Sequence, residues 1–176
     1  NAIHQDDITT VTETLSKVNA RFSLEMTDLA SYASKYGATK VLRYLFVNER
    51  VNPEMRILVN ASEIRQSTSF IHNAVKIQNL EMCKMLVEEF HVDVNRSLSD
   101  ETPLLVAIKS GNIPLCTYLI VNAKADVRGS YYNRPLFAAI ENGNVQLCEL
   151  LIKHGVDINE GYRDGSAPRN LFDDIT

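Results

Sequence analysis

The fold is decided by the stretch TPLLVAIKSGNIPLCTYLIVNAKADVR at residues 102–128, because similar stretches flank it on both sides. It is preceded by SFIHNAVKIQNLEMCKMLVEEFHVDVN at residues 69–95 and followed by RPLFAAIENGNVQLCELLIKHGVDIN at residues 134–159. Equivalent residues recur at intervals of 31 to 33 positions in three series: Ala74, Ala107 and Ala139; Cys83, Cys116 and Cys148; and Asp93, Asp126 and Asp157. Self-similarity at such a period is the signature of a repeat protein, in which each unit is one supersecondary element.

Each unit has the pattern of two short antiparallel helices. The first begins at Pro103 or Pro135, since proline at the first helical position loses no hydrogen bond. It ends at Gly111 or Gly143, because glycine adopts the left-handed conformation of a helix cap without steric cost. The second helix places its apolar residues on one stripe, as at Leu115, Cys116, Leu119 and Ile120. The sequence therefore predicts an all-α fold of stacked helix–turn–helix units.

A weaker unit lies upstream, at residues 33–46, with the sequence ASKYGATKVLRYLF. It keeps the small residue, a glycine at Gly37 and the apolar spacing of the second helix. The step from Ala33 to Ala74 is 41 residues, which is longer than the period of the later units. The extra length falls in the stretch after Val51, and it forms either a long finger or a short extra helix. We favour a helical turn that starts at Pro53.

The two ends of the chain extend this pattern. Apolar residues at helical spacing from Ile8 to Phe22 predict an N-terminal helical cap over residues 1–23, in which Asn1 and Ala2 are expected to be a tag remnant. Residues 161–176 restart the repeat and are expected to be a partial unit. The predicted organisation consists of repeats at about residues 24–52, 67–96, 100–128 and 132–160, with an insertion at about 53–66.

The composition excludes several classes of protein. A 45% hydrophobic chain with 23% charged residues can bury a core, and a net charge of −4 without a basic block argues against nucleic-acid binding. No stretch reaches the ~20 consecutive apolar residues that a membrane-spanning helix needs. No charged start followed by an apolar block indicates a secretory signal. We therefore expect a cytoplasmic protein, or one delivered into a host cytosol if it is an effector, with no nucleic-acid or membrane partner.

The residues that could carry chemistry form no catalytic pattern. The cysteines recur with the repeat period in the middle of each second helix, so we expect them to pack in the core instead of serving as reactive thiols or metal ligands. His4, His91 and His154 are scattered and have no sequence-local nucleophile or carboxylate partner. Acidic pairs such as Asp6-Asp7 predict a solvated surface. We expect no enzymatic activity, no metal and no cofactor.

These motifs resemble the ankyrin repeat. The Thr-Pro-Leu helix start of that family is matched at residues 102–104, its paired alanines by Ala138 and Ala139, its inter-helix glycine by Gly143, and its exit sequence at residues 155–159. The resemblance covers roughly residues 29–170. It implies an ankyrin-repeat solenoid of about four full repeats, in which each unit contacts only its neighbours.

The resemblance also assigns roles to two residues of the second unit. His72 stands at the position of the family's usual histidine in the first helix, which implies hydrogen bonds that bridge neighbouring repeats. Gln78 replaces the glycine between the helices. A residue with a side chain in the left-handed conformation costs about 1–2 kcal/mol, so Gln78 is expected to be a strained position.

In this family, partners are gripped on the concave side by the turn tips and by exposed positions on the first helices. The implied contact residues on the first helices are Lys76, Ile77, Lys109, Ser110, Glu141 and Asn142. Those in the finger turns are Arg96, Leu98, Tyr131, Tyr132, Asn133, Tyr162 and Arg163. Tyr131 and Tyr132 stand out because exposed tyrosines are enriched at binding hot spots. The alternative is that one of them packs against the adjacent repeat.

The resulting hypothesis is a monomeric protein–protein interaction module that binds another protein, of unidentified nature, through the concave face and the turn fingers. The alternative is a regulatory or targeting segment of a larger multidomain protein, for example an effector with a catalytic domain elsewhere in its chain. A third hypothesis, a small-molecule or nucleic-acid binder, requires a deep pocket or a basic stripe.

Overall fold

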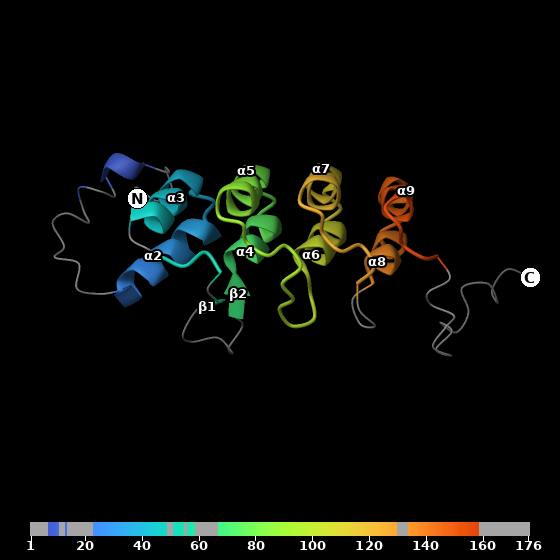
Figure 1. The fold of residues 1–176 in the computed structure, drawn as a ribbon, viewed down its shortest axis with the longest axis horizontal. Helices are drawn as coiled ribbons and strands as arrows, with labels where there is room; N and C mark the ends of the chain where they lie inside the picture. The colour runs from blue at the N-terminus through green and yellow to red at the C-terminus, as the bar shows by residue number, and fades with distance from the viewer. Residues whose placement is uncertain are drawn as a thin grey trace, which may run out of the picture.

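The computed structural model describes residues 7–10, 13, 23–48, 51–54, 56–58, 67–129 and 134–158. Within them the helices lie in pairs, with the first member of each pair in one layer and the second in another (Figure 1). The pairs are α2 (Ser23–Lys35) with α3 (Thr39–Asn48), α4 (Phe70–Lys76) with α5 (Leu80–Lys84), α6 (Pro103–Lys109) with α7 (Ile113–Thr117), and α8 (Pro135–Glu141) with α9 (Val145–Lys153). Successive first helices pack against each other, so the predicted stack of helix pairs is confirmed.

The helices begin and end where the sequence signals predict. Thr102 caps α6 by accepting a hydrogen bond from the Leu105 amide at 3.3 Å. An asparagine caps each of the later second helices in the same way, at Asn79, Asn112 and Asn144. Between the helices of each pair one residue adopts the left-handed conformation, namely Gly37, Gln78, Gly111 and Gly143, with φ of 74°, 57°, 68° and 63°. The expected strained conformation of Gln78 is thus confirmed.

The second helices of the second and third units contain one residue more than that of the fourth. From the capping asparagine to the aspartate of the exit the step is 14 residues in those two units and 13 in the fourth. The extra residue is absorbed by the π-helical turns η1 (Met85–Glu89) and η2 (Tyr118–Asn122). In η2 the Ala123 amide donates to the Tyr118 carbonyl, five residues earlier, at 3.0 Å. A π-turn accommodates an inserted residue without ending the helix, whereas α9 is α-helical throughout.

A continuous apolar core runs through the stack. The repeated alanines Ala74, Ala107 and Ala139 are fully buried where neighbouring first helices meet. Cys83 and Cys116 are also fully buried, and burial raises the pKa of both thiols to about 12, which confirms a packing role. Cys148 is only half-buried, because no described residue stacks on the outer side of the fourth pair.

The insertion after the first pair contains a β-ribbon. Strands β1 (Arg56–Leu58) and β2 (Ser67–Ser69) pair antiparallel, with Ile57 opposite Thr68. The helical turn predicted from Pro53 is therefore wrong. The reason is local: Asn52 occupies the place of the exit aspartate in the later units, and its side chain accepts from the Glu54 amide at 2.9 Å. This bonding pattern produces the same exit turn as in the other units and leads the chain into extended backbone instead of a helix.

The predicted N-terminal cap is described only at residues 7–10 and 13. Residues 8–10 and Glu13 are helical, and Ile8 packs against the core. The Asp7 carboxylate accepts from the amides of Thr9 and Thr10, as an N-cap does. The remaining apolar positions of this helix and the predicted partial repeat at 161–176 lie outside the described residues. Among the described helices, none has both the length and the apolar composition needed to cross a bilayer.

Candidate interaction surface

Each first helix ends on an exposed charged residue at the same place in the repeat. These residues are Lys35, Lys76, Lys109 and Glu141, the last residues of α2, α4, α6 and α8. The next residue in each unit is Tyr36, Ile77, Ser110 or Asn142, and it is exposed as well. We call these eight residues the helix-end row. Six of them were predicted as contact residues. Lys35 and Tyr36 were not, although they occupy the equivalent place just before Gly37.

The members of the helix-end row differ in how they are engaged. Ile77 exposes 38% of its surface, a large fraction for an isoleucine. Lys109 pairs with Glu101 at 2.5 Å, with both side chains about half exposed. Ser110 donates to the Ala107 carbonyl at 2.8 Å, and the Asn142 amide group donates to the Ile108 carbonyl of the preceding unit at 2.7 Å. Asn142 therefore also joins two units, whereas the Ser110 bond lies within the end of its own helix.

The finger before α6 is a tight turn that corrects one predicted contact. Leu98 and Glu101 exchange backbone hydrogen bonds at 2.9 and 3.0 Å across Ser99 and Asp100, which both have positive φ. Leu98 lies beneath this turn with only 7% of its surface exposed. Its predicted role as a contact residue is wrong, because an apolar side chain in the finger packs against the stack. The exposed tip consists of Ser99 and Asp100.

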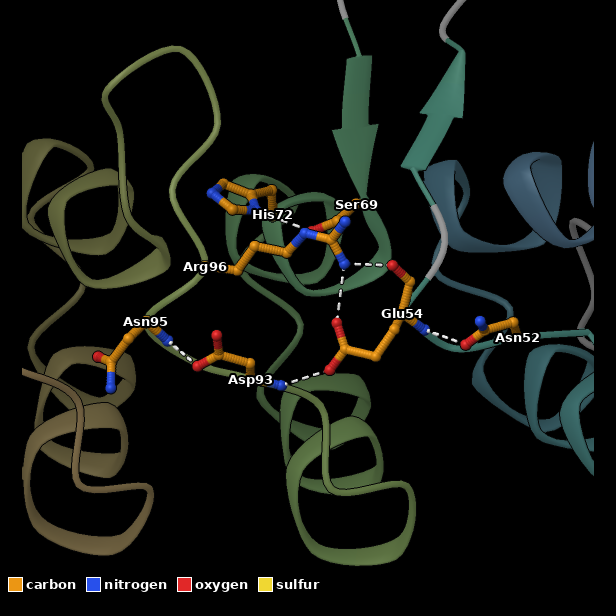
Figure 2. A network of polar contacts seen from close by, with 7 residues as sticks. All are labelled: Asn52, Glu54, Ser69, His72, Asp93, Asn95 and Arg96. Atoms are coloured by element: carbon orange, nitrogen blue, oxygen red, sulfur yellow. Dashed lines mark hydrogen bonds and ion pairs between the residues drawn. The ribbon is translucent and has the colours of Figure 1, made fainter.

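Arg96, another predicted contact residue, is engaged inside the molecule. Figure 2 shows its guanidinium turned toward Glu54, whose carboxylate it meets at 2.8 Å and whose carbonyl oxygen accepts a second hydrogen bond. The other Glu54 carboxylate oxygen accepts from the Asp93 amide at 2.6 Å. Arg96 thus joins the exit turns of the first and second units, which reduces its availability for a partner.

The exit turns form a ladder of hydrogen bonds that sequence reasoning did not predict. Within each turn the side chain at the aspartate position accepts from the amide two residues later: Asn52 from Glu54, Asp93 from Asn95, and Asp126 from Arg128, at 2.9 to 3.0 Å. Between turns, Asn95 accepts from the Asp126 amide at 2.8 Å, just as Glu54 accepts from Asp93. The signal was an acceptor side chain two residues after the exit position of the first and second units, at Glu54 and Asn95.

His72 bridges two units, as the resemblance implied. Its Nε2 lies 3.0 Å from the carbonyl oxygen of Glu101, in the next unit, and its Nδ1 lies 2.8 Å from Ser69 Oγ. Since a carbonyl can only accept, Nε2 carries the proton and Nδ1 accepts from the Ser69 hydroxyl. Burial lowers the pKa of His72, which favours this neutral form. The expected inter-repeat hydrogen bond is confirmed.

The remaining predicted contact residues, Tyr131, Tyr132, Asn133, Tyr162 and Arg163, lie outside the described residues, so their roles stay predictions. In the described part of the chain, no three His, Cys, Asp or Glu side chains converge on a point that could hold a metal ion.

Paired helices that stack in register and are joined through their exit turns define a helical repeat protein. A family model described as ankyrin repeats (3 copies) matches residues 30–129 and, in a second register, residues 71–162. The chain belongs to the ankyrin-repeat family. Ankyrin repeats are generally non-catalytic, protein-binding modules. No curated protein sequence matches the chain.

Proposed function

We propose that this protein is an interaction module that binds another protein through the helix-end row and the adjoining finger turns. The main support is the exposure of the first-helix ends. Lys76 and Ile77 are exposed immediately after the fully buried Ala74 and Val75, and the same change from buried to exposed recurs at the end of the other first helices. The row is therefore held by the core of the stack itself.

A row of this kind suits rigid-surface recognition. Its backbone is ordered by burial and by capped helices before any partner arrives, so binding loses little conformational entropy there. The inter-repeat bonds of His72 and Glu54 also maintain the spacing between units. A partner that spans several units would then contact side chains whose relative positions are already set.

The test is affinity capture followed by mass spectrometry, using the unaltered chain and two matched double variants. Lys76→Glu with Ile77→Ala changes the helix-end row, while Lys153→Glu with Val47→Ala makes the same types of change at exposed positions of α9 and α3. We expect a partner that the first variant captures severalfold less well and the second captures normally. Equal capture by all three proteins would place the binding surface elsewhere.

A further inference from the structure

The helix-end row has a chemical character that narrows the kind of partner it fits. We propose that it binds an extended acidic segment of a protein, with carboxylates at every third residue and one apolar side chain among them. This inference rests on the proposed function, since it names the partner of the same surface. It depends on the charge, the spacing and the apolar content of the row.

The charge of the row is opposite to that of the chain. The net charge is −4, yet three successive first helices end on lysine. Among the residues that the structure describes, no carboxylate lies within ion-pair distance of Lys35 or Lys76. Lys109 is paired with Glu101, but exposed pairs of this kind contribute little free energy, so a carboxylate of the partner can replace Glu101.

The spacing of the lysines matches an extended chain. Packed helices lie about 8–10 Å apart, so we expect equivalent positions on neighbouring first helices to be separated by about that distance. A polyproline II segment rises about 3.1 Å per residue with three residues per turn, so every third side chain lies on the same face about 9 Å farther along. Carboxylates at every third position of such a segment would meet Lys35, Lys76 and Lys109 in turn.

An apolar site adjoins the first two lysines. Tyr36 exposes 43% of its surface and Ile77 38%. Ile77 lies against Gly37, the residue after Tyr36, since a Cβ placed on Gly37 would come 3.3 Å from Ile77 Cδ1. An apolar side chain between the first two carboxylates of the partner would cover this pair. The corresponding residues of the later units, Ser110 and Asn142, are polar.

The fourth unit ends the acidic stretch of the partner. Glu141 occupies the place of the lysines, so a fourth carboxylate would meet a like charge. The reversal of charge limits the register of the bound segment, because a carboxylate placed one unit farther would face Glu141. It also disfavours a nucleic acid, whose phosphates continue at every nucleotide and would be repelled by Glu141 and by the net charge of the chain.

The experiment is an NMR titration of the labelled protein with a synthetic peptide that has glutamate at every third position, proline in between and one leucine between the first two glutamates. Three probes serve as controls: the same peptide with glutamine for glutamate, a peptide of the same composition with its glutamates adjacent, and an oligothymidylate. We expect saturable shift changes at the ends of α2, α4 and α6 with the first peptide, and weaker binding at higher salt.

The protein variants separate recognition from helix stability. Lysine at a helix C-terminus also stabilises the helix by interacting with its dipole. Replacing such a lysine therefore lowers the stability of the protein even where the side chain contacts no ligand. Lys76→Gln should lower the affinity for the first peptide by about two- to fivefold, which is the effect of one exposed ion pair. Lys153→Gln on α9 should leave the affinity for this peptide unchanged. Thermal unfolding checks that both variants remain folded at the titration temperature.

Three results would overturn the proposal: equal affinity for the glutamine peptide, tighter binding of the oligothymidylate, or a Lys76→Gln variant that binds the first peptide as well as the unaltered chain does. None of these results would contradict the proposed function, because the affinity-capture experiment tests that function separately. If Ile77→Ala reduces capture of the partner while Lys76→Gln does not, the helix-end row is still the binding surface. The proposal that its partner is acidic would then be wrong.

Discussion

Gln78 is the clearest case of a single residue at odds with its backbone. It has a φ of 57° at the place where the other three pairs have glycine, and its side chain accepts a hydrogen bond from Asn112 at 3.1 Å. The left-handed conformation is costly for a residue with a Cβ, and an exposed amide–amide bond returns only a small part of that cost. The position is therefore a local weakness within an otherwise regular stack.

Replacing this residue should stabilise the protein. Gln78→Gly is expected to raise the free energy of unfolding by roughly 1 kcal/mol, measured by urea denaturation. The matched control is Gly111→Ala at the equivalent place in the next unit, where the space around the added methyl group is empty and only the backbone cost remains. That variant should lose a similar amount. A Gln78→Gly protein no more stable than the unaltered chain would contradict this account.

His72 predicts a pH dependence. Burial holds its pKa in the folded protein below the ordinary value of 6.5, so the unfolded chain binds a proton more readily than the folded one. The contribution of His72 to the free energy of unfolding is then fully present above about pH 6.5. It decreases as the pH falls below that value toward the pKa of His72 in the folded protein. Urea denaturation at pH 7.5 and 5.5 should show the loss, and His72→Gln should reduce it. If the loss were instead removed by His154→Gln, at an exposed position, the bridge would not be its source.

At the scale of the elements, the exit-turn ladder holds neighbouring units together through Glu54. Glu54→Ala removes both the ion pair with Arg96 and the acceptor of the Asp93 amide, and should lower the free energy of unfolding by about 1 kcal/mol. Glu54→Gln retains an oxygen acceptor and should lose less. Arg128→Ala, at the equivalent place two units later, should change little because that side chain is well exposed. Equal losses in all three variants would mean that the ladder contributes nothing specific.

Sequence reasoning predicted the elements that depend on period and on single signals. Local steric rules predicted the helix starts at Pro103 and Pro135, the left-handed conformation of Gly111 and the burial of the repeated alanines. The structure confirms these predictions. The β-ribbon did not follow, because Pro53 signals a helix start and a turn equally well and the deciding contact is the Asn52 side chain. The π-turns were not predicted either, because their only sequence signal is one additional residue in the second helices of the second and third units.

The candidate contact surface was harder to predict than the fold. Exposed positions at the helix ends follow from the repeat register, so Lys76 and Ile77 could be chosen from sequence. Finger residues depend on turn geometry that no periodicity encodes. Leu98 is buried beneath its own turn, and Arg96 is held by a residue 42 positions earlier in the chain. Such contacts follow from the stacking of units, which brings distant exit turns together.

At the scale of the whole molecule, stacking determines which apolar residues contribute to stability. Ile108 and Ile140 occupy the same place in successive units, yet Ile108 is fully buried while Ile140 exposes 46% of its surface. The difference arises because α8 covers the former and no described residue covers the latter. The same contrast separates Ile120 from Ile152 on the second helices.

These equivalent isoleucines provide a direct comparison. Ile108→Ala should lower the free energy of unfolding by about 2–4 kcal/mol, the usual cost of a cavity in a packed core. Ile140→Ala should cost under about 1 kcal/mol, since the described neighbours leave its side chain half in water. Chemical denaturation of the two variants measures both values. Comparable losses would show that a further segment covers Ile140, and the fourth pair would then not be the end of the packed stack.

We propose that the ends of the first helices form the binding surface. Hydrogen exchange of the protein with and without its captured partner tests it most directly, because protection is read along the whole chain. We expect slower exchange on binding at residues 36–38, 77–79 and 110–112, with α5 and α9 unchanged. Protection confined to the second helices, with the first-helix ends exchanging as in the free protein, would contradict it.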